Sequence, residues 1–112
     1  ITGSIGVFGL LFNSQKFFDG KLGITFDEVK THSSSDMMSG SRRLTAFEQQ
    51  RIQSDVNTTY KTFLNVVKQG RKKFADENEV GEVAEGRVWV GQKALEIGLV
   101  DELGSLNQAI LK

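Results

Sequence analysis

The chain has 112 residues, of which 38% are hydrophobic and 25% are charged, with 12 glycines and neither cysteine nor proline. This length suits one domain at most, and the lack of cysteine excludes disulfide frameworks, thiolate metal sites and a cysteine nucleophile. Because the 14 basic and 14 acidic residues cancel, we expect no overall electrostatic attraction to nucleic acid.

The first quarter of the chain predicts two strands and a short helix. Residues 1–12, ITGSIGVFGLLF, are apolar with glycine interruptions, which indicates a buried strand followed by a tight turn. Asn13 or Ser14 can cap a short helix that ends near Phe18. Residues 24–32, ITFDEVKTH, alternate enough to predict a second strand. Since a strand-like sequence begins at Ile1 without an initiator methionine, we expect the chain to be a fragment of a longer protein.

A serine-rich loop over residues 33–43 precedes the longest predicted helix. Thr45 and Glu48 form a capping box, in which each side chain binds an N–H group that the first helical turn leaves unpaired. The helix should end near Phe74, and the basic residues of its last turns suit a solvated helix end. Its apolar residues recur mostly every three or four positions and predict one buried face: Phe47, Ile52, Val56, Tyr60, Phe63, Leu64, Val67 and Phe74.

The last third of the chain predicts short elements in quick succession. A helix begins near Glu77, and a short strand follows at residues 87–91, RVWVG. Residues 92–98, QKALEIG, form a helix closed by Gly98, and a turn then leads into a terminal helix. This order of strands and helices predicts an α/β fold with an incomplete sheet.

The residue patterns alone assign no catalytic centre. His32 is the only histidine, and no carboxylate pair stands at a metal-ligand spacing from it, so we expect no metal site. A Ser-His-Asp triad would have to use His32, whose serine neighbours lie in a flexible loop. Ser4 in TGSIG lacks the glycine two residues earlier that a nucleophile elbow needs, and phosphate-binding glycine motifs are absent. From the residues alone, Ser4 is most simply a serine at a turn or strand end.

A family resemblance gives Ser4 a further interpretation. Residues 86–110, GRVWVGQKALEIGLVDELGSLNQAI, resemble the C-terminal signature of the signal peptide peptidase SppA, or protease IV, family. ITGSIGVFG and MMSGSRRLTAFE resemble the family's Thr-Gly-Ser strand and the loop that enters its long helix. The resemblance implies a ClpP/crotonase-like fold, incomplete here, with residues 1–112 forming the C-terminal part of one peptidase unit. It also implies a serine endopeptidase without a cofactor, which degrades cleaved signal peptides or similar apolar peptides by a Ser-Lys dyad.

The same resemblance makes Ser4 a supporting residue that contacts and orients the lysine amine. The family's nucleophilic serine lies upstream of this segment and is therefore expected outside the chain. Ser35 occupies the position of the family's lysine, and Lys30 lies too early in the sequence. Long family members carry two tandem units, and in them the N-terminal unit supplies the lysine. We therefore expect the chain to belong to the C-terminal unit of a long member and to be inactive alone.

Other interpretations remain open at this point. The chain could be a catalytically silent paralogue, or a non-catalytic assembly unit of an SppA-like oligomer. A crotonase-type acyl-CoA enzyme is a weaker alternative, because ALEIGLVDEL also resembles a stretch of that superfamily. The preferred family further implies peptide substrates, the parent's N-terminal unit and copies of the same chain as partners. It implies a location at the bacterial inner membrane, with the catalytic part facing the periplasm or the outside.

Overall fold

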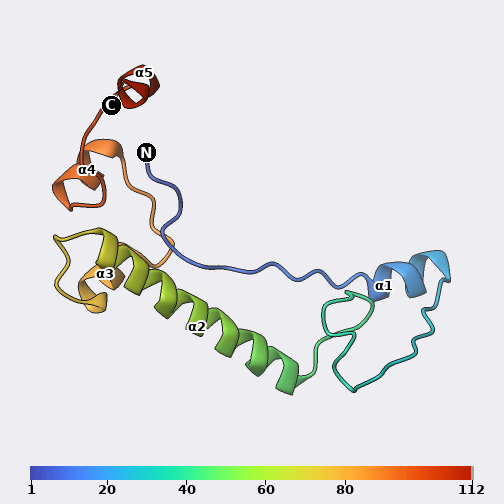
Figure 1. Cartoon of the computed structure of the whole chain (residues 1–112). Coiled ribbons are helices and arrows are strands. Elements are labelled where there is room, and N and C mark those ends of the chain that lie inside the picture. The colour runs from blue at the N-terminus through green and yellow to red at the C-terminus, as the bar shows by residue number, and fades with distance from the viewer. Residues whose placement is uncertain (112) are drawn as a thin grey trace. The chain divides into compact units, whose positions relative to one another are not determined.

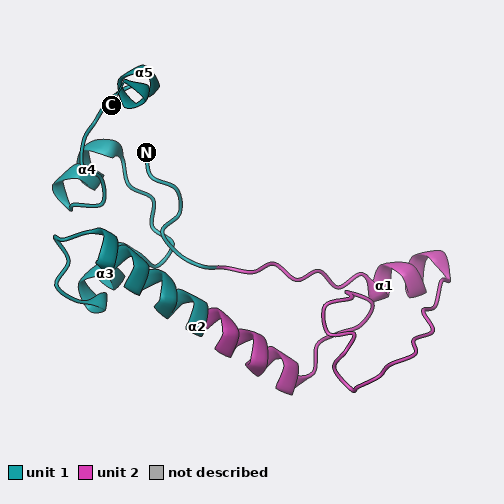
Figure 2. Cartoon of the chain, in the orientation of Figure 1, with its two compact units in different colours: residues 1–7, 58–112 teal, residues 8–57 magenta. Residues whose placement is uncertain are grey.

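The computed structural model describes residues 1–111, which divide into two compact units (Figure 2). Unit 1 comprises residues 1–7 and the chain from residue 58 onward, and unit 2 comprises residues 8–57. The elements of the described chain are all helical (Figure 1). They are α1 (Gln15–Phe17), the π-helical turn η1 (Phe18–Leu22), α2 (Ala46–Gly70), α3 (Glu77–Val83), α4 (Gly91–Glu96) and α5 (Leu106–Ile110).

Helix α2 begins as the sequence predicts but ends earlier. The Glu48 N–H donates to Thr45 Oγ1 at 3.2 Å and the Thr45 N–H donates to Glu48 Oε2 at 2.8 Å, which confirms the capping box. The predicted end near Phe74 is wrong, because the helix stops at Gly70. Glycine favours this stop, since it has a low helix propensity. The chain then turns, with the Phe74 N–H bound to the Arg71 carbonyl at 3.2 Å.

The core of unit 1 forms where this turn brings the C-terminal half of α2 against the shorter helices. Tyr60 and Phe63 of α2 stack beside it with ring centroids 6.3 Å apart. Burial of apolar surface is the main stabilising term of such a cluster. Six residues form its buried centre: Leu64, Phe74, Val80, Ala84, Ala94 and Leu99.

The short helices of unit 1 are fixed by local caps. Asp76 accepts hydrogen bonds from the N–H groups of Asn78 and Glu79, so α3 begins at Glu77 as predicted. Ser105 forms a capping box with Gln108 at the start of α5. Gly98 closes the turn after α4 with φ at 83°, a left-handed conformation that glycine adopts without strain. These features confirm the predicted helices of the last third of the chain.

The predicted strands do not form as regular strands in the described residues. Ile5 and Arg87 make an isolated antiparallel bridge, and no ladder extends from it within residues 1–111. The strand predictions for residues 1–12, 24–32 and 87–91 are therefore wrong beyond that bridge. The physical reason is that a strand needs a hydrogen-bonded neighbour, whereas an apolar pattern shows only which side chains avoid water.

Candidate functional site

The TGSIG segment lies beside the GRVW segment in unit 1. The Thr2 N–H donates to the Trp89 carbonyl at 2.8 Å, and the Ile5 N–H donates to the Arg87 carbonyl at 3.1 Å. The Gly86 N–H returns a hydrogen bond to the Ile5 carbonyl at 2.8 Å. Two motifs from opposite ends of the sequence therefore form one short antiparallel pairing, which fixes the backbone around Ser4.

Ser4 is exposed at this pairing, and its hydroxyl donates to the Gly86 carbonyl at 3.2 Å. The two residues are 82 positions apart in the sequence. A serine hydroxyl has one donor and two acceptor lone pairs, so a hydroxyl that donates to a carbonyl can still accept from an amine. The carbonyl cannot take the hydroxyl proton, and activation of a serine nucleophile needs a base. The geometry therefore suits a supporting acceptor better than a nucleophile.

Two glycines allow the close approach of the segments. A Cβ atom on Gly6 would lie 2.7 Å from the backbone nitrogen of Gly86, closer than real Cβ atoms come, and 3.0 Å from its Cα, which is tighter than most real contacts. Gly86 itself has φ at 79°, in the left-handed region. The pairing that holds Ser4 therefore depends on the absence of a side chain at Gly6.

Replacing Gly6 with alanine should separate the two segments. We expect amide hydrogen exchange at Gly86, whose N–H binds the Ile5 carbonyl, to accelerate by about tenfold or more. Gly9→Ala is the matched control, since a Cβ there would meet nothing within 4 Å. Equal exchange at Gly86 in the two variants, measured by NMR, would contradict the assigned contact.

Unit 2 contains an ion cluster built around Arg42. Its Nε and Nη2 donate to Asp36 at 2.6 and 2.7 Å, and its two Nη atoms donate to Glu48 at 2.6 and 2.8 Å. Nη1 also donates to the Arg43 carbonyl at 3.0 Å. A guanidinium has five N–H donors, so these five hydrogen bonds use all of them. Arg42 thus ties the serine-rich loop to the first turn of α2.

The carboxylates of this cluster are held in their charged forms. The guanidinium of Arg42 keeps the pKa of Glu48 well below its ordinary value, assisted by the Thr45 N–H, although the Glu48 side chain is only 1% exposed. Arg42, and then Lys30, keep the pKa of Asp36 below its usual range. Hydrogen bonds that favour the ionised carboxylate outweigh the cost of removing it from water.

Lys30 belongs to the same cluster. Its Nζ lies 2.6 Å from Asp36 Oδ2 and 3.2 Å from Glu28 Oε2. Hydrogen bonds to Asp36 and then to Glu28 raise the pKa of Lys30 above its ordinary value. A lysine acts as a general base only in its neutral form. These partners therefore oppose a role of Lys30 as a base.

The serine-rich loop does not assemble a catalytic group. Ser35, at the position where the resemblance expects a lysine, donates to the His32 carbonyl at 2.9 Å. Ser33 Oγ lies 3.4 Å from His32 Nδ1, and both groups are exposed. Among the described residues, no carboxylate hydrogen bonds to this imidazole and no group of acidic or histidine side chains could hold a metal ion.

Comparison with known proteins assigns the chain to a family. The family model described as Peptidase family S49 matches residues 1–112. The chain belongs to peptidase family S49. It is 39% identical over 109 residues to the putative signal peptide peptidase SppA of Enterococcus faecium, covering 97% of this chain and 31% of that protein. It is 34% identical over 112 residues to Protease 4 of Salmonella typhi, covering 100% of this chain and 18% of that protein.

A third relative is the putative protease slr0021 of Synechocystis, which is 38% identical over 109 residues. The alignment covers 97% of this S49 chain and 38% of that protein. The chain thus spans less than two fifths of each of these relatives. S49 membership confirms the family resemblance and implies the ClpP/crotonase-like fold, of which the described residues show the helices and a single bridge.

Sequence reasoning about this S49 chain missed the Arg42 cluster. The capping box signalled Glu48, but only the fold of the loop shows that its carboxylate also binds Arg42. In the sequence, Asp36, Arg42 and Glu48 follow one another at intervals of six residues. This interval matches neither the helix nor the strand period, so it did not indicate that the three side chains meet. No helix among the described residues has the length and apolar character needed to cross a membrane.

Proposed function

We propose that the chain is part of a serine endopeptidase that cleaves apolar peptides, such as cleaved signal peptides, with a Ser-Lys dyad. Its nucleophile and its lysine base lie outside residues 1–112, in the rest of a longer parent, and the chain alone is inactive. The observation that carries the proposal is the exposed Ser4 hydroxyl, which is anchored to the Gly86 carbonyl and free to accept a hydrogen bond.

The lysine and serine residues discussed above do not supply a general base, which supports the proposal that the base comes from outside the chain. Lys30 is paired with two carboxylates and kept cationic. Ser33 and Ser35 are exposed turn residues whose hydroxyls hydrogen bond to His32. An efficient base must be largely neutral at the working pH, which burial and suitable neighbours achieve for a lysine.

The proposed mechanism uses Ser4 to orient the lysine base. The external serine attacks the peptide carbonyl, and its proton passes to the neutral lysine amine. Ser4 accepts a hydrogen bond from an N–H of that amine while its own O–H donates to the Gly86 carbonyl. The lysine lone pair is thereby directed at the nucleophile, and the protonated lysine later returns the proton to the leaving amine. Ser4 is a positioning residue in this scheme.

A chimera tests this role directly. We expect Protease 4 of Salmonella typhi, with its matching stretch replaced by this chain, to retain peptidase activity. Ser4→Ala in the chimera should lower kcat by about 10- to 100-fold, because misorientation of a catalytic group has effects of this size. It should also shift the acid-side limb of the pH-rate profile, on which activity rises as the lysine loses its proton, and a purely structural change would not do this. Ser33→Ala is the control and should leave both kcat and the pH-rate profile unchanged.

The isolated chain provides the opposing measurement. The purified 112-residue protein should hydrolyse no peptide, since it would lack nucleophile and base. Peptidase activity of this chain that Ser4→Ala abolishes would overturn the assignment of Ser4 as a positioning residue.

A second candidate function is a non-catalytic assembly unit, which the large number of exposed apolar side chains favours. In either case we propose that the parent's N-terminal unit and further copies of the chain are partners. We also propose that the parent acts at the bacterial inner membrane, facing the periplasm or the outside. An inactive chimera that forms the same oligomer as Protease 4 would favour the assembly function.

A further inference from the structure

Helix α2 contacts the turn that carries the Gly86 carbonyl. The Glu85 N–H donates to the phenol oxygen of Tyr60 at 3.3 Å, across 25 positions of the sequence. The carbonyl of the next residue, Gly86, accepts the hydroxyl of Ser4. We propose that Tyr60 is a positioning residue for Ser4, because its hydroxyl fixes the turn to which Ser4 is anchored. The inference rests on the proposed peptidase function and adds to it a residue that acts through Ser4.

The turn at residues 84–87 has a conformation that needs support. The Arg87 N–H donates to the Ala84 carbonyl at 3.0 Å, and Glu85 and Gly86 between them have φ at 53° and 79°. Positive φ at both central positions is typical of a type I′ turn, which favours glycine, asparagine and aspartate. Glycine meets this requirement, but the Cβ atom of Glu85 makes the same region unfavourable. Such a residue stays there only where its surroundings fix it.

Tyr60 supplies a fixed contact for Glu85. The Tyr60 ring is half-buried, packs against the buried cluster of unit 1 and stacks on Phe63 with the ring planes at 21°. The close-packed core therefore sets the position of the ring and of the oxygen at its edge. Because a backbone N–H requires an acceptor, an oxygen held in this place favours the left-handed conformation of Glu85.

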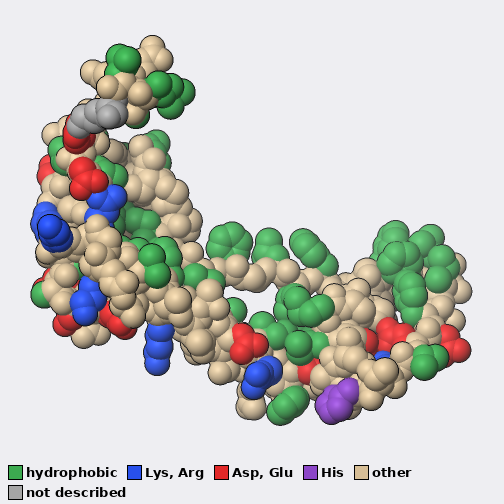
Figure 3. All heavy atoms as spheres, viewed as in Figure 1, with side chains coloured by type: hydrophobic (Ala, Val, Ile, Leu, Met, Phe, Trp, Pro, Cys, Tyr) green, Lys and Arg blue, Asp and Glu red, His purple; other side chains and the backbone are tan. Residues whose placement is uncertain are grey.

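The contacts of the Glu85 side chain are weaker supports for the turn. Arg87 Nη2 donates to Glu85 Oε2 at 3.0 Å, and Arg87 Nη1 donates to the Glu82 carbonyl. The Glu85 and Arg87 side chains are 66% and 44% exposed, and exposed ion pairs contribute little to stability. Figure 3 shows acidic and basic side chains interspersed on the visible face of unit 1, where salt and water screen them. We therefore expect the contact from Tyr60 to fix the turn.

Gly86 transmits the position of the turn to Ser4. Its N–H donates to the Ile5 carbonyl at 2.8 Å, and its carbonyl accepts the Ser4 hydroxyl at 3.2 Å. A rotation of the Glu85 backbone would move both of these groups, because they belong to the next residue along the chain. Loss of the Tyr60 hydroxyl should therefore loosen the anchor of Ser4 without a direct contact between the two side chains.

Replacing Tyr60 with phenylalanine removes the oxygen and keeps the ring. We expect exchange of the Glu85 and Gly86 amides in the purified chain to accelerate about three- to tenfold, which corresponds to one hydrogen bond. Thr62→Val is the matched control, since it removes an exposed hydroxyl of α2 that donates to the Thr58 carbonyl at 3.1 Å. Equal exchange at Gly86 in Tyr60→Phe and Thr62→Val, measured by NMR, would overturn the proposal.

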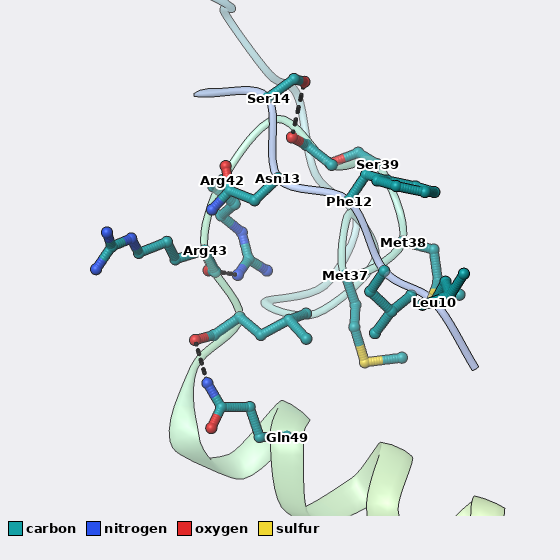
Figure 4. A pocket seen from close by; sticks show the side chains of 13 residues that line it. Leu10, Phe12, Asn13, Ser14, Met37, Met38, Ser39, Arg42, Arg43 and Gln49 are labelled. Carbon is teal, nitrogen blue, oxygen red and sulfur yellow. Dashed lines mark hydrogen bonds between the residues drawn. The ribbon is translucent and has the colours of Figure 1, made fainter. Parts of the chain in front are cut away.

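A cavity of unit 2 provides a second control. It has a volume of about 710 Å³ and is lined by residues of the serine-rich loop, by residues 10–14 and by Gln49 of α2 (Figure 4). None of its lining residues belongs to TGSIG or to the turn at residues 84–87. Gln49→Ala changes this lining and should leave amide exchange at Gly86 unchanged. Acceleration at Gly86 as large as that in Tyr60→Phe would overturn the assigned contact.

The chimera with Protease 4 of Salmonella typhi distinguishes a positioning role from a general loss of stability. Tyr60→Phe should lower kcat by about three- to tenfold and leave KM unchanged. It should also shift the acid-side limb of the pH-rate profile in the same direction as Ser4→Ala does. Because Tyr60 acts through Ser4, the double variant should have the kcat of Ser4→Ala alone. Multiplied effects of the two substitutions would show that Tyr60 acts by another route and would overturn the proposal.

The outcomes separate this inference from the proposed function. A chimera that Ser4→Ala impairs and Tyr60→Phe does not would overturn the role of Tyr60 and keep the proposed function. An inactive chimera, or one that Ser4→Ala leaves unimpaired, would count against the proposed function. In that case faster exchange at Gly86 in Tyr60→Phe would still support the hold of Tyr60 on the Ser4 anchor, and equal exchange would overturn it.

Discussion

Replacing Arg42 with methionine is expected to lower the melting temperature of the chain by more than about 5 °C. Arg42 donates two hydrogen bonds to each of Asp36 and Glu48, and the Glu48 side chain is only 1% exposed. The variant leaves a buried carboxylate without its cation, which is the costly way to break such a pair. Circular dichroism during heating measures the effect.

Two controls distinguish this result from a general loss of charge. Arg51→Met removes an exposed arginine whose Nε lies 3.8 Å from Asp55, and it should change the melting temperature little. Combining Arg42→Met with Glu48→Met should recover part of the loss, because the unpaired carboxylate is gone. Equal melting temperatures for Arg42→Met and Arg51→Met would refute the role of the cluster.

The Arg42 cluster also makes the stability of the folded chain depend on pH. Arg42 keeps the pKa values of Asp36 and Glu48 in the folded chain below their ordinary values. In the unfolded chain these carboxyls take up protons near pH 4. The stabilisation is therefore fully present above about pH 5 and is lost as the pH falls below about 4. The difference in stability between the original chain and Arg42→Met should shrink over the same range.

Helix starts could be predicted because their signals are local. Thr45 and Glu48 lie three residues apart, so the capping box is visible in the sequence and forms as expected. Asp76 and Gly98 likewise mark the ends of short helices with their own side chain or conformation. The end of α2 was misplaced because Phe74 continues the apolar spacing after the helix has stopped at Gly70. Periodicity cannot distinguish a helical residue from one that reaches the same core through a turn.

The strands and the ion cluster depend on contacts that the sequence does not encode locally. Residues 8–12 have a strand-like composition, but no partner within the described chain hydrogen bonds to their backbone. The pairing of Ile5 with Arg87 joins residues from opposite ends of the chain. Arg42 likewise reaches its carboxylates only after the serine-rich loop has folded back on α2. Ser4 was singled out from the motif, whereas its Gly86 partner required the structure.

Replacing Phe74 with alanine is expected to destabilise unit 1 by about 3–5 kcal/mol, the usual cost of removing a buried phenylalanine. Phe74 is 8% exposed and belongs to the buried cluster with Leu64 and Val80. Trp89 is the only tryptophan, and its indole N–H donates to the Val83 carbonyl at 2.8 Å. Its fluorescence during urea unfolding therefore reports on unit 1.

The matched control is Phe47→Ala, which makes the same change at a side chain that is 70% exposed. Ile5 and Trp89 pack against the buried cluster that contains Phe74, so the core supports the pairing that holds Ser4. Phe74→Ala should therefore also accelerate amide exchange at Gly86, whereas Phe47→Ala should not. A lower free energy of unfolding for Phe74→Ala with unchanged exchange at Gly86 would show that the Ser4 segment holds its position without the core. Lower stability together with faster exchange at Gly86 would instead show that the stability of unit 1 and the placement of Ser4 depend on the same packing.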